Sequence, residues 1–96
     1  GTASSHYAPN TKTTLVDCEN IHELSNPDAI VITIKGTPRI TKHAFVMPNC
    51  PTQYAAKLYT TLREADELGA HEIIIESPPK SPEWNAVMNR LLRASS

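Results

Sequence analysis

Two short runs of apolar, largely β-branched residues constrain the fold of this chain more than any other feature of its sequence. Residues 29–34 read Ala-Ile-Val-Ile-Thr-Ile, and residues 72–76 place three isoleucines between two glutamates. A strand with one face in water alternates apolar and polar residues, whereas a strand buried on both faces does not. Residues 29–34 are therefore predicted to lie in a sheet covered by helices on each side, and residues 72–76 to form a further strand.

Two other segments repeat apolar residues at helical spacing, which predicts two amphipathic helices. The first begins at Pro51 and ends before Gly69, a residue suited to the positive φ that follows many helices; its apolar positions are Tyr54, Leu58, Leu62 and Ala65. The second follows a predicted N-cap at Ser81, with Pro82 at its first position. Its apolar positions are Trp84, Val87, Met88, Leu91 and Leu92, and Trp84 is expected to lie in the core.

Shorter patterns complete the prediction. Residues 13–17 and 44–47 are expected to be strands, and residues 20–24 a helical turn closed by Asn26-Pro27, because a proline disfavours helix in the residue before it. Strands that alternate with helices predict an α/β fold, here a small Rossmann-like three-layer α/β/α sandwich with a mainly parallel sheet of about four strands. A chain of 96 residues is long enough for one such core.

Composition argues against several classes of protein. Nine Lys and Arg face ten Asp and Glu, a balance that does not indicate a strongly basic nucleic-acid surface. No apolar run approaches the roughly 20 residues of a membrane helix, so no membrane partner is expected. Cys18 and Cys50 are interpreted as buried thiols of a cytoplasmic protein, because their separation suits neither a metal site nor a disulfide framework.

No motif in the sequence carries a reaction by itself. The Gly36-Thr37-Pro38 turn lacks the glycine spacing of phosphate-binding loops, and the four histidines lack metal-ligand spacing, so no metal site is expected. Glu72 and Glu76 would lie about 13 Å apart along a strand, too far for acid–base partnership, and are expected to be solvated strand ends. Arg63 and Asp66 are interpreted as a surface ion pair or, alternatively, as a docking contact with another domain.

Four segments carry a resemblance to a known family. Residues 1–9, which end in His6-Tyr7-Ala8-Pro9, resemble the interdomain linker S-P-G-[MT]-x-x-x-H-Y-A-P of the long, two-domain threonylcarbamoyl-AMP synthases. Residues 56–66, AKLYTTLREAD, are similar to that family's A-[RK]-x-L-Y-x-x-L-R-x-x-D helix, with one residue fewer after the lysine. Residues 73–76 and 86–94 fit its C-terminal pattern A-[IV]-x-[DN]-R-L-x-R-A, so that the resemblance spans essentially the whole chain.

The resemblance implies a function. Such enzymes join a YrdC-type catalytic domain to a smaller, Rossmann-like C-terminal domain, and they convert L-threonine, bicarbonate and ATP into threonylcarbamoyl-adenylate for tRNA modification. Residues 1–12 would be the end of the linker and residues 13–96 the C-terminal domain. ATP and magnesium would bind to the catalytic domain, the expected partner within the same chain. This fragment would then hold no cofactor and have no synthase activity alone.

The linker motif is predicted to be a lid over the ATP pocket, formed by His6, Tyr7, Ala8 and Pro9. Tyr7 offers an aromatic face and a phenolic donor, His6 offers a donor and an acceptor, and Pro9 restricts the residue before it to extended geometry. Such a tip can exclude water from a labile carbamoyl-adenylate. Many relatives carry a tyrosine where this chain has Ser4, so an ATP contact is expected from Tyr7 instead.

On the long helix, the resemblance makes Tyr59, Arg63 and Asp66 candidates for docking onto the catalytic domain. Two other classes of function stay open: a free-standing module that binds a small ligand or nucleotide at the carboxyl edge of its sheet, and a structural dimerisation domain. Direct tRNA contact through Lys57, Arg63, Arg90 and Arg93 is disfavoured by the near-neutral net charge.

Overall fold

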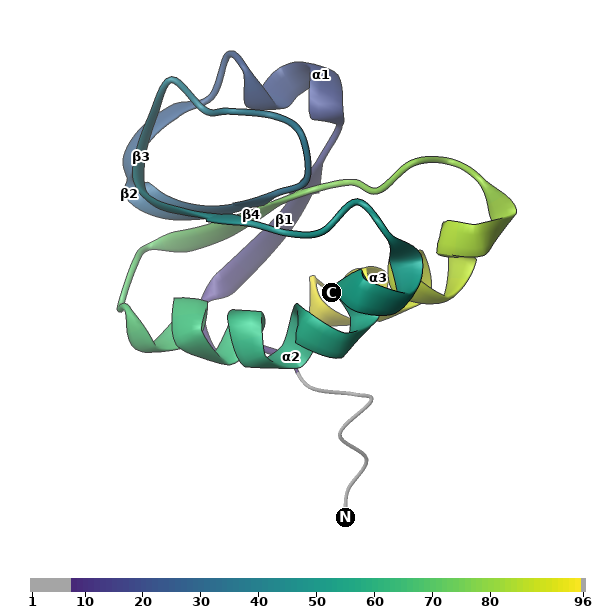
Figure 1. Ribbon diagram of the computed structural model, residues 1–96. Coiled ribbons are helices and arrows are strands. Elements are labelled where there is room, and N and C mark those ends of the chain that lie inside the picture. The colour runs from purple at the N-terminus through teal and green to yellow at the C-terminus, as the bar shows by residue number, and fades with distance from the viewer. Residues whose placement is uncertain (1–7, 96) are drawn as a thin grey trace.

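A computed structural model describes residues 8–95 as an α/β domain built on a four-stranded sheet (Figure 1). Along the chain its elements are β1 (Lys12–Val16), α1 (Cys18–Ile21), β2 (Ser25–Thr33), β3 (Ile40–Val46), α2 (Pro51–Glu67), β4 (Glu72–Glu76), the 3-10 turn η2 (Pro82–Trp84) and α3 (Asn85–Ala94). The order of strands and helices is the predicted one.

All four strands are parallel, and their order across the sheet is β1-β4-β2-β3. The central strand β4 pairs with β1 on one side and β2 on the other, so that Ile73 is opposite both Thr13 and Ile30. The two apolar runs of the sequence are therefore the two inner strands. This arrangement confirms the prediction of a parallel sheet whose central strands are buried on both faces.

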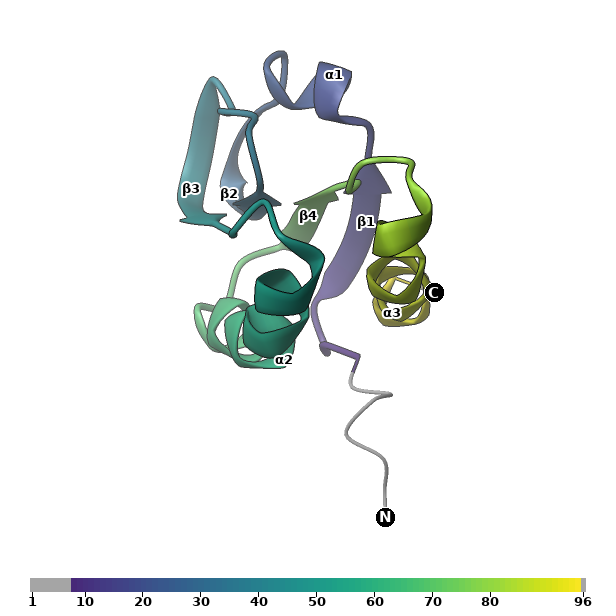
Figure 2. The same cartoon turned by 45° about the vertical axis from the view of Figure 1, so that its right-hand side comes forward.

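Helices α2 and α3 lie on the same face of the sheet (Figure 2) and cover the main core. Ile30 and Ile32 of β2, with Ile73 and Ile75 of β4, point toward this face because alternate residues of a strand share a side. The helices contribute the positions that the sequence placed on their apolar stripes, which are Tyr54, Leu58, Leu62, Ala65, Trp84, Val87, Leu91 and Ala94.

The opposite face carries a smaller cluster of buried residues, formed by Ile21, Ala29, Val31 and Ile74. Its cover is the single turn α1 together with residues 34–39, which connect β2 to β3. The backbone of Gly36 passes so close to Ile21 that a Cβ at Gly36 would lie 2.6 Å from Ile21 Cγ2. The predicted third layer is therefore present, but it consists of one short helix and a closely packed loop.

The largest differences from the predicted boundaries are at the starts of three elements. The short helix α1 begins at Cys18 rather than at residue 20, β3 begins at Ile40 rather than at residue 44, and β2 begins at Ser25 and runs through Pro27. Proline is tolerated in a strand where the ladder is irregular. The pairing of β2 with β3 shifts register between Asn26 and Ile30, and the Asn26 side chain there accepts a hydrogen bond from the Asp28 amide, 3.0 Å away.

The ends of the two long helices follow the sequence signals closely. Pro51 opens α2, and Gly69 follows its end with a φ of +71°. Pro82 opens the last helical segment as a 3-10 turn that becomes α3, although the Ser81 side chain makes no capping hydrogen bond. Within residues 8–95, neither these helices nor α1 is long and apolar enough to cross a membrane.

Candidate functional site

The described chain begins inside the predicted lid motif. His6 and Tyr7 lie outside residues 8–95, so their placement in a lid stays a prediction. Ala8 is exposed and Pro9 is half-buried, and together they lead into β1 through Asn10 and Thr11. The residues that directly follow the motif are therefore the ones that show how it is attached to the domain.

Asp66, in the last turn of α2, holds this attachment. Its carboxylate accepts hydrogen bonds from the Asn10 amide to Oδ2 at 3.1 Å and from the Thr11 amide to Oδ1 at 2.9 Å. The Thr11 hydroxyl donates a third hydrogen bond to Oδ1 at 2.6 Å. Hydrogen bonds to an ionised carboxylate are stronger than those between neutral groups. We call this arrangement of Asn10, Thr11 and Asp66 the linker clamp.

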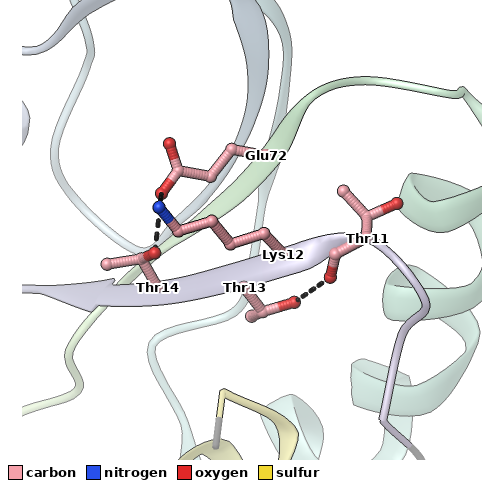
Figure 3. A network of polar contacts seen from close by, with 5 residues as sticks. All are labelled: Thr11, Lys12, Thr13, Thr14 and Glu72. Atoms are coloured by element: carbon pink, nitrogen blue, oxygen red, sulfur yellow. Dashed lines mark hydrogen bonds and ion pairs between the residues drawn. The ribbon is translucent and has the colours of Figure 1, made fainter.

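The neighbouring residues tie the clamp to the sheet (Figure 3). The Thr13 hydroxyl donates to the Thr11 carbonyl at 3.0 Å. On β4, Glu72 Oε2 accepts a hydrogen bond from the Thr14 hydroxyl at 2.6 Å and lies 3.9 Å from Lys12 Nζ. The Lys12 side chain is mostly exposed, so that this ion pair adds little stability. The chain after the lid motif is thus held by α2 on one side and by β4 on the other.

The predicted docking residues lie along α2 at steps of four and three, which places them on neighbouring turns of one side of the helix. Tyr59 is half-buried and packs against the main core, and Arg63 is exposed. Asp66 is half-buried, and its carboxylate accepts the three hydrogen bonds of the linker clamp. Docking of Tyr59 and Arg63 onto another domain stays a prediction, whereas Asp66 has an observed role inside the domain.

A second polar site lies at the opposite end of the sheet, and the sequence prediction for it is wrong. Glu76 is not a solvated strand end: it is 3% exposed, and its Oε1 accepts hydrogen bonds from three consecutive backbone amides. These belong to Ile34 at 2.8 Å, Lys35 at 3.2 Å and Gly36 at 3.1 Å. Successive amides that converge in this way form a small anion-binding concavity, which Glu76 fills with a carboxylate of the same chain.

A signal for this contact was present in the sequence. Parallel strands end at the same edge of a sheet, so Glu76 at the end of β4 must lie near the residues that follow β2. Glycine at position 36 lets the backbone pass close to Ile21, where a Cβ would clash, while its amide faces Glu76. What could not be read from the sequence was the adjacency of β4 and β2, which are separated along the chain by β3 and α2.

Tyr54 is a further buried polar group near Glu76. Its ring packs edge-on against Trp84, with ring centroids 5.6 Å apart, and its hydroxyl is enclosed without a hydrogen-bond partner in the described part of the chain. Burial, and secondly the negative charge of Glu76, raise the pKa of the Tyr54 hydroxyl far above its ordinary value near 10. Tyr54 is therefore a neutral phenol that fills the core.

The two cysteines and the histidines of residues 8–95 are not grouped into a metal site. Cys18 and Cys50 are free thiols, but Cys18 is exposed and Cys50 half-buried, so the prediction that both are buried is wrong. Cys18 is the first residue of α1, and Cys50 directly precedes α2. Across residues 8–95, no group of three or more His, Cys, Asp or Glu side chains is placed to hold a metal ion.

Comparison with known protein families gives a match over the whole chain. The chain matches the family model described as threonylcarbamoyl-AMP synthase, C-terminal domain, over residues 1–96. No curated protein and no solved structure shows a significant match to the chain. Asp66 is the final residue of the L-R-x-x-D helix pattern, so this pattern contains the residue that binds the Asn10 and Thr11 amides.

Proposed function

Since the chain belongs to the threonylcarbamoyl-AMP synthase C-terminal domain family, we propose that it positions the interdomain linker of such an enzyme over the active site of the catalytic domain. The linker clamp is the observation that supports this role. It grips the two residues that directly follow the His6-Tyr7-Ala8-Pro9 motif, and it does so from a helix that is itself packed into the core.

The clamp defines the base of the lid. Asp66 binds the amides of Asn10 and Thr11, and Pro9 restricts Ala8 to extended geometry, so the chain leaves the domain in one direction. A lid with a fixed base loses less conformational entropy when it closes than one on a free tail. The domain therefore raises the fraction of time for which His6 and Tyr7 lie over the substrate.

In this proposal, the reaction itself takes place on the catalytic domain. That domain would bind ATP, magnesium and L-threonine and form threonylcarbamoyl-adenylate for tRNA modification. In the C-terminal domain, the backbone amides of residues 34–36 bind the Glu76 carboxylate of the same chain. The contribution of this domain is to help keep water from the labile product.

Substitution of Asp66 in the two-domain enzyme tests this role. Asp66→Ala removes the acceptor of three hydrogen bonds, and we expect synthesis of threonylcarbamoyl-adenylate to slow about tenfold, which corresponds to roughly 1.4 kcal/mol. Thr11→Val removes only the hydroxyl donor and should have a smaller effect in the same direction. Glu67→Ala, one residue along the same helix and exposed, is the matched control and should leave the rate unchanged.

Product leakage separates a lid function from a merely structural one. In the Asp66→Ala enzyme, a larger fraction of the ATP consumed should end as AMP without threonylcarbamoyl-adenylate, because water reaches the intermediate. Circular dichroism of the same variant checks that the domain is folded. Unchanged rate and unchanged leakage in a folded Asp66→Ala enzyme would contradict the proposal.

The 96-residue chain alone should be inactive. When it is incubated with L-threonine, bicarbonate, ATP and magnesium, we expect no pyrophosphate release above the buffer level, because the proposal assigns the ATP site to the catalytic domain. Formation of threonylcarbamoyl-adenylate by this chain would show that the catalytic centre has been assigned to the wrong domain.

A further inference from the structure

A cavity of about 870 Å³ opens at the carboxyl ends of β1, β4 and β2. Its lining includes Asp17 after β1, Gly36 after β2, and Glu76 and Ser77 at the end of β4. This volume is within the range of about 300–1,000 Å³ that is typical of small-molecule sites. The linker clamp lies at the other end of β1, so this cavity is separate from the surface on which the proposed lid is held.

The topology of the sheet creates this cavity. After β1 the chain enters α1, whose Ile21 packs on one face of the sheet, and the segment after β2 packs on the same Ile21 through Gly36. After β4 the chain turns to the opposite face, where Trp84 joins the main core. Connections that leave neighbouring parallel strands toward opposite faces open a crevice between them, and ligands of open α/β sheets bind there.

Glu76 supplies an incompletely used carboxylate in this crevice. Its Oε1 accepts all three backbone hydrogen bonds, whereas its Oε2 accepts none from the described residues. Among residues 8–95, the only side-chain N or O atom that is both fully enclosed and without a hydrogen-bond partner is the Tyr54 hydroxyl. Oε2 of Glu76 has no such partner either, so it is not fully enclosed and solvent reaches it. Because Glu76 is 3% exposed and lines the cavity, a group that enters the cavity can satisfy Oε2.

Charged side chains of both signs line this cavity, with Asp17, Glu19 and Glu76 as acids and Lys35 and Lys80 as bases. Asp17 precedes α1, and its carboxylate makes no capping hydrogen bond to that helix. Lys35 and Lys80 also line the cavity, are exposed, and make no ion pair with a carboxylate among residues 8–95. The cavity therefore offers acceptors for a cation at Glu76 and Asp17, and donors for an anion at the two lysines.

We propose that this cavity binds a small zwitterionic amine of the α-amino acid type. Its ammonium group donates hydrogen bonds to Glu76 Oε2 and Asp17, and its carboxylate lies toward Lys35 and Lys80. A metal ion does not fit, because the acidic side chains are not placed as a ligand set. A phosphate does not fit, because Glu76 already occupies the backbone amides that would bind it.

The test is an NMR titration of the 96-residue chain with three kinds of probe: a panel of α-amino acids, ethylamine and inorganic phosphate. At least one amino acid should give saturable amide shifts at Gly36, Glu76 and Ser77, with a dissociation constant in about the millimolar range expected for so few atoms. Ethylamine should bind more weakly at the same amides. Saturable shifts with phosphate alone, or with none of the probes, would overturn the proposal.

Glu76→Gln identifies the group that binds the ammonium. Its amide oxygen can still accept from residues 34–36, but its amino group replaces Oε2, so the dissociation constant of the amino acid should rise at least about tenfold. Glu72→Gln makes the same change at the other end of β4 and should leave binding unchanged. Unaltered affinity in Glu76→Gln, or equal losses in the two variants, would contradict the assignment.

The role of the two lysines is tested by comparing a ligand that has a carboxylate with one that lacks it. The double variant Lys35→Ala and Lys80→Ala should weaken binding of the amino acid severalfold and leave binding of ethylamine unchanged, with Lys57→Ala on α2 as the control. An equal effect on both ligands would refute the placement of the carboxylate. All these measurements use the isolated chain, so their outcome is independent of the linker proposal, which is tested by synthesis in the two-domain enzyme.

Discussion

At the scale of single residues, a buried carboxylate and a glycine form one structural unit. Glu76 draws three backbone amides toward its Oε1, and the chain can approach so closely only because position 36 has no side chain. A Cβ there would lie 2.6 Å from Ile21 Cγ2 and 2.9 Å from Ile21 Cβ, well inside van der Waals contact. Gly36 is therefore required by packing and not by its φ angle.

Gly36→Ala should destabilise the domain by about 1–3 kcal/mol, the usual cost of overpacking, as measured by urea denaturation. Gly69→Ala is the comparison, because position 69 has open space but a φ of +71° and should cost about 1 kcal/mol through backbone strain. Combining each variant with Ile21→Ala separates the causes. Ile21→Ala should relieve part of the Gly36→Ala cost and none of the Gly69→Ala cost; additivity in both pairs would refute the packing argument.

The buried Tyr54 hydroxyl gives the stability a specific dependence on high pH. Its pKa is raised in the folded state, whereas in the unfolded chain it ionises near pH 10. The free energy of unfolding does not depend on this group below pH 10. Above pH 10 it falls progressively, because the unfolded state then binds fewer protons than the folded one. Relative to Tyr54→Phe, the free energy of unfolding should fall by about 1.4 kcal/mol per pH unit above pH 10.

Below pH 10, Tyr54→Phe should be neutral or stabilising, because it removes a hydroxyl that has no partner in the described structure. Denaturation of both proteins at pH 8 and pH 11 measures the two effects together. Parallel pH profiles for the two proteins would show that the hydroxyl is hydrated in the folded state.

At the scale of elements, the helices were the most predictable parts of the fold. The last helix carries Leu91 and Leu92 side by side in its apolar pattern, and the structure separates them: Leu91 is 0% exposed and Leu92 is 52% exposed. Leu91→Ala should cost about 2–5 kcal/mol of stability and Leu92→Ala less than about 0.5 kcal/mol, as measured by denaturation. Equal costs would mean that α3 does not pack with the observed face.

The strands β2 and β3 were less predictable, because local signals oppose their first halves. Pro27 indicates an end to regular structure, yet the shifted register beside it accommodates the missing amide donor. Residues 40–43 of β3 are half-buried or exposed at the sheet edge, so no alternation of buried residues marks them as strand. Tertiary pairing with β2, and not local propensity, defines this half of β3.

At the scale of the whole molecule, the spacing of apolar residues along the sequence predicts the helices and strands. It does not predict which strands lie next to one another in the sheet. The apolar run of residues 29–34 predicted a sheet covered on both sides, which the two buried clusters confirm. The family resemblance named Asp66 as a candidate for docking onto another domain and did not indicate its contact with Asn10 and Thr11. The strand order β1-β4-β2-β3 was not readable, and without it neither the burial of Glu76 nor the cavity beside it could be foreseen. The partner of Asp66 within the chain was hidden for the same reason, since 55 residues separate it from Thr11.

The linker clamp also determines how the domain responds to mechanical load. A pulling force applied to the chain before Ala8 acts first on the three hydrogen bonds at Asp66 and then on the backbone ladder that joins β1 to β4. Since β1 is an edge strand that pairs with β4 alone, this load is carried by a single ladder at the margin of the sheet. The linker clamp therefore protects the outermost strand, because its hydrogen bonds take up the load before the β1–β4 ladder does.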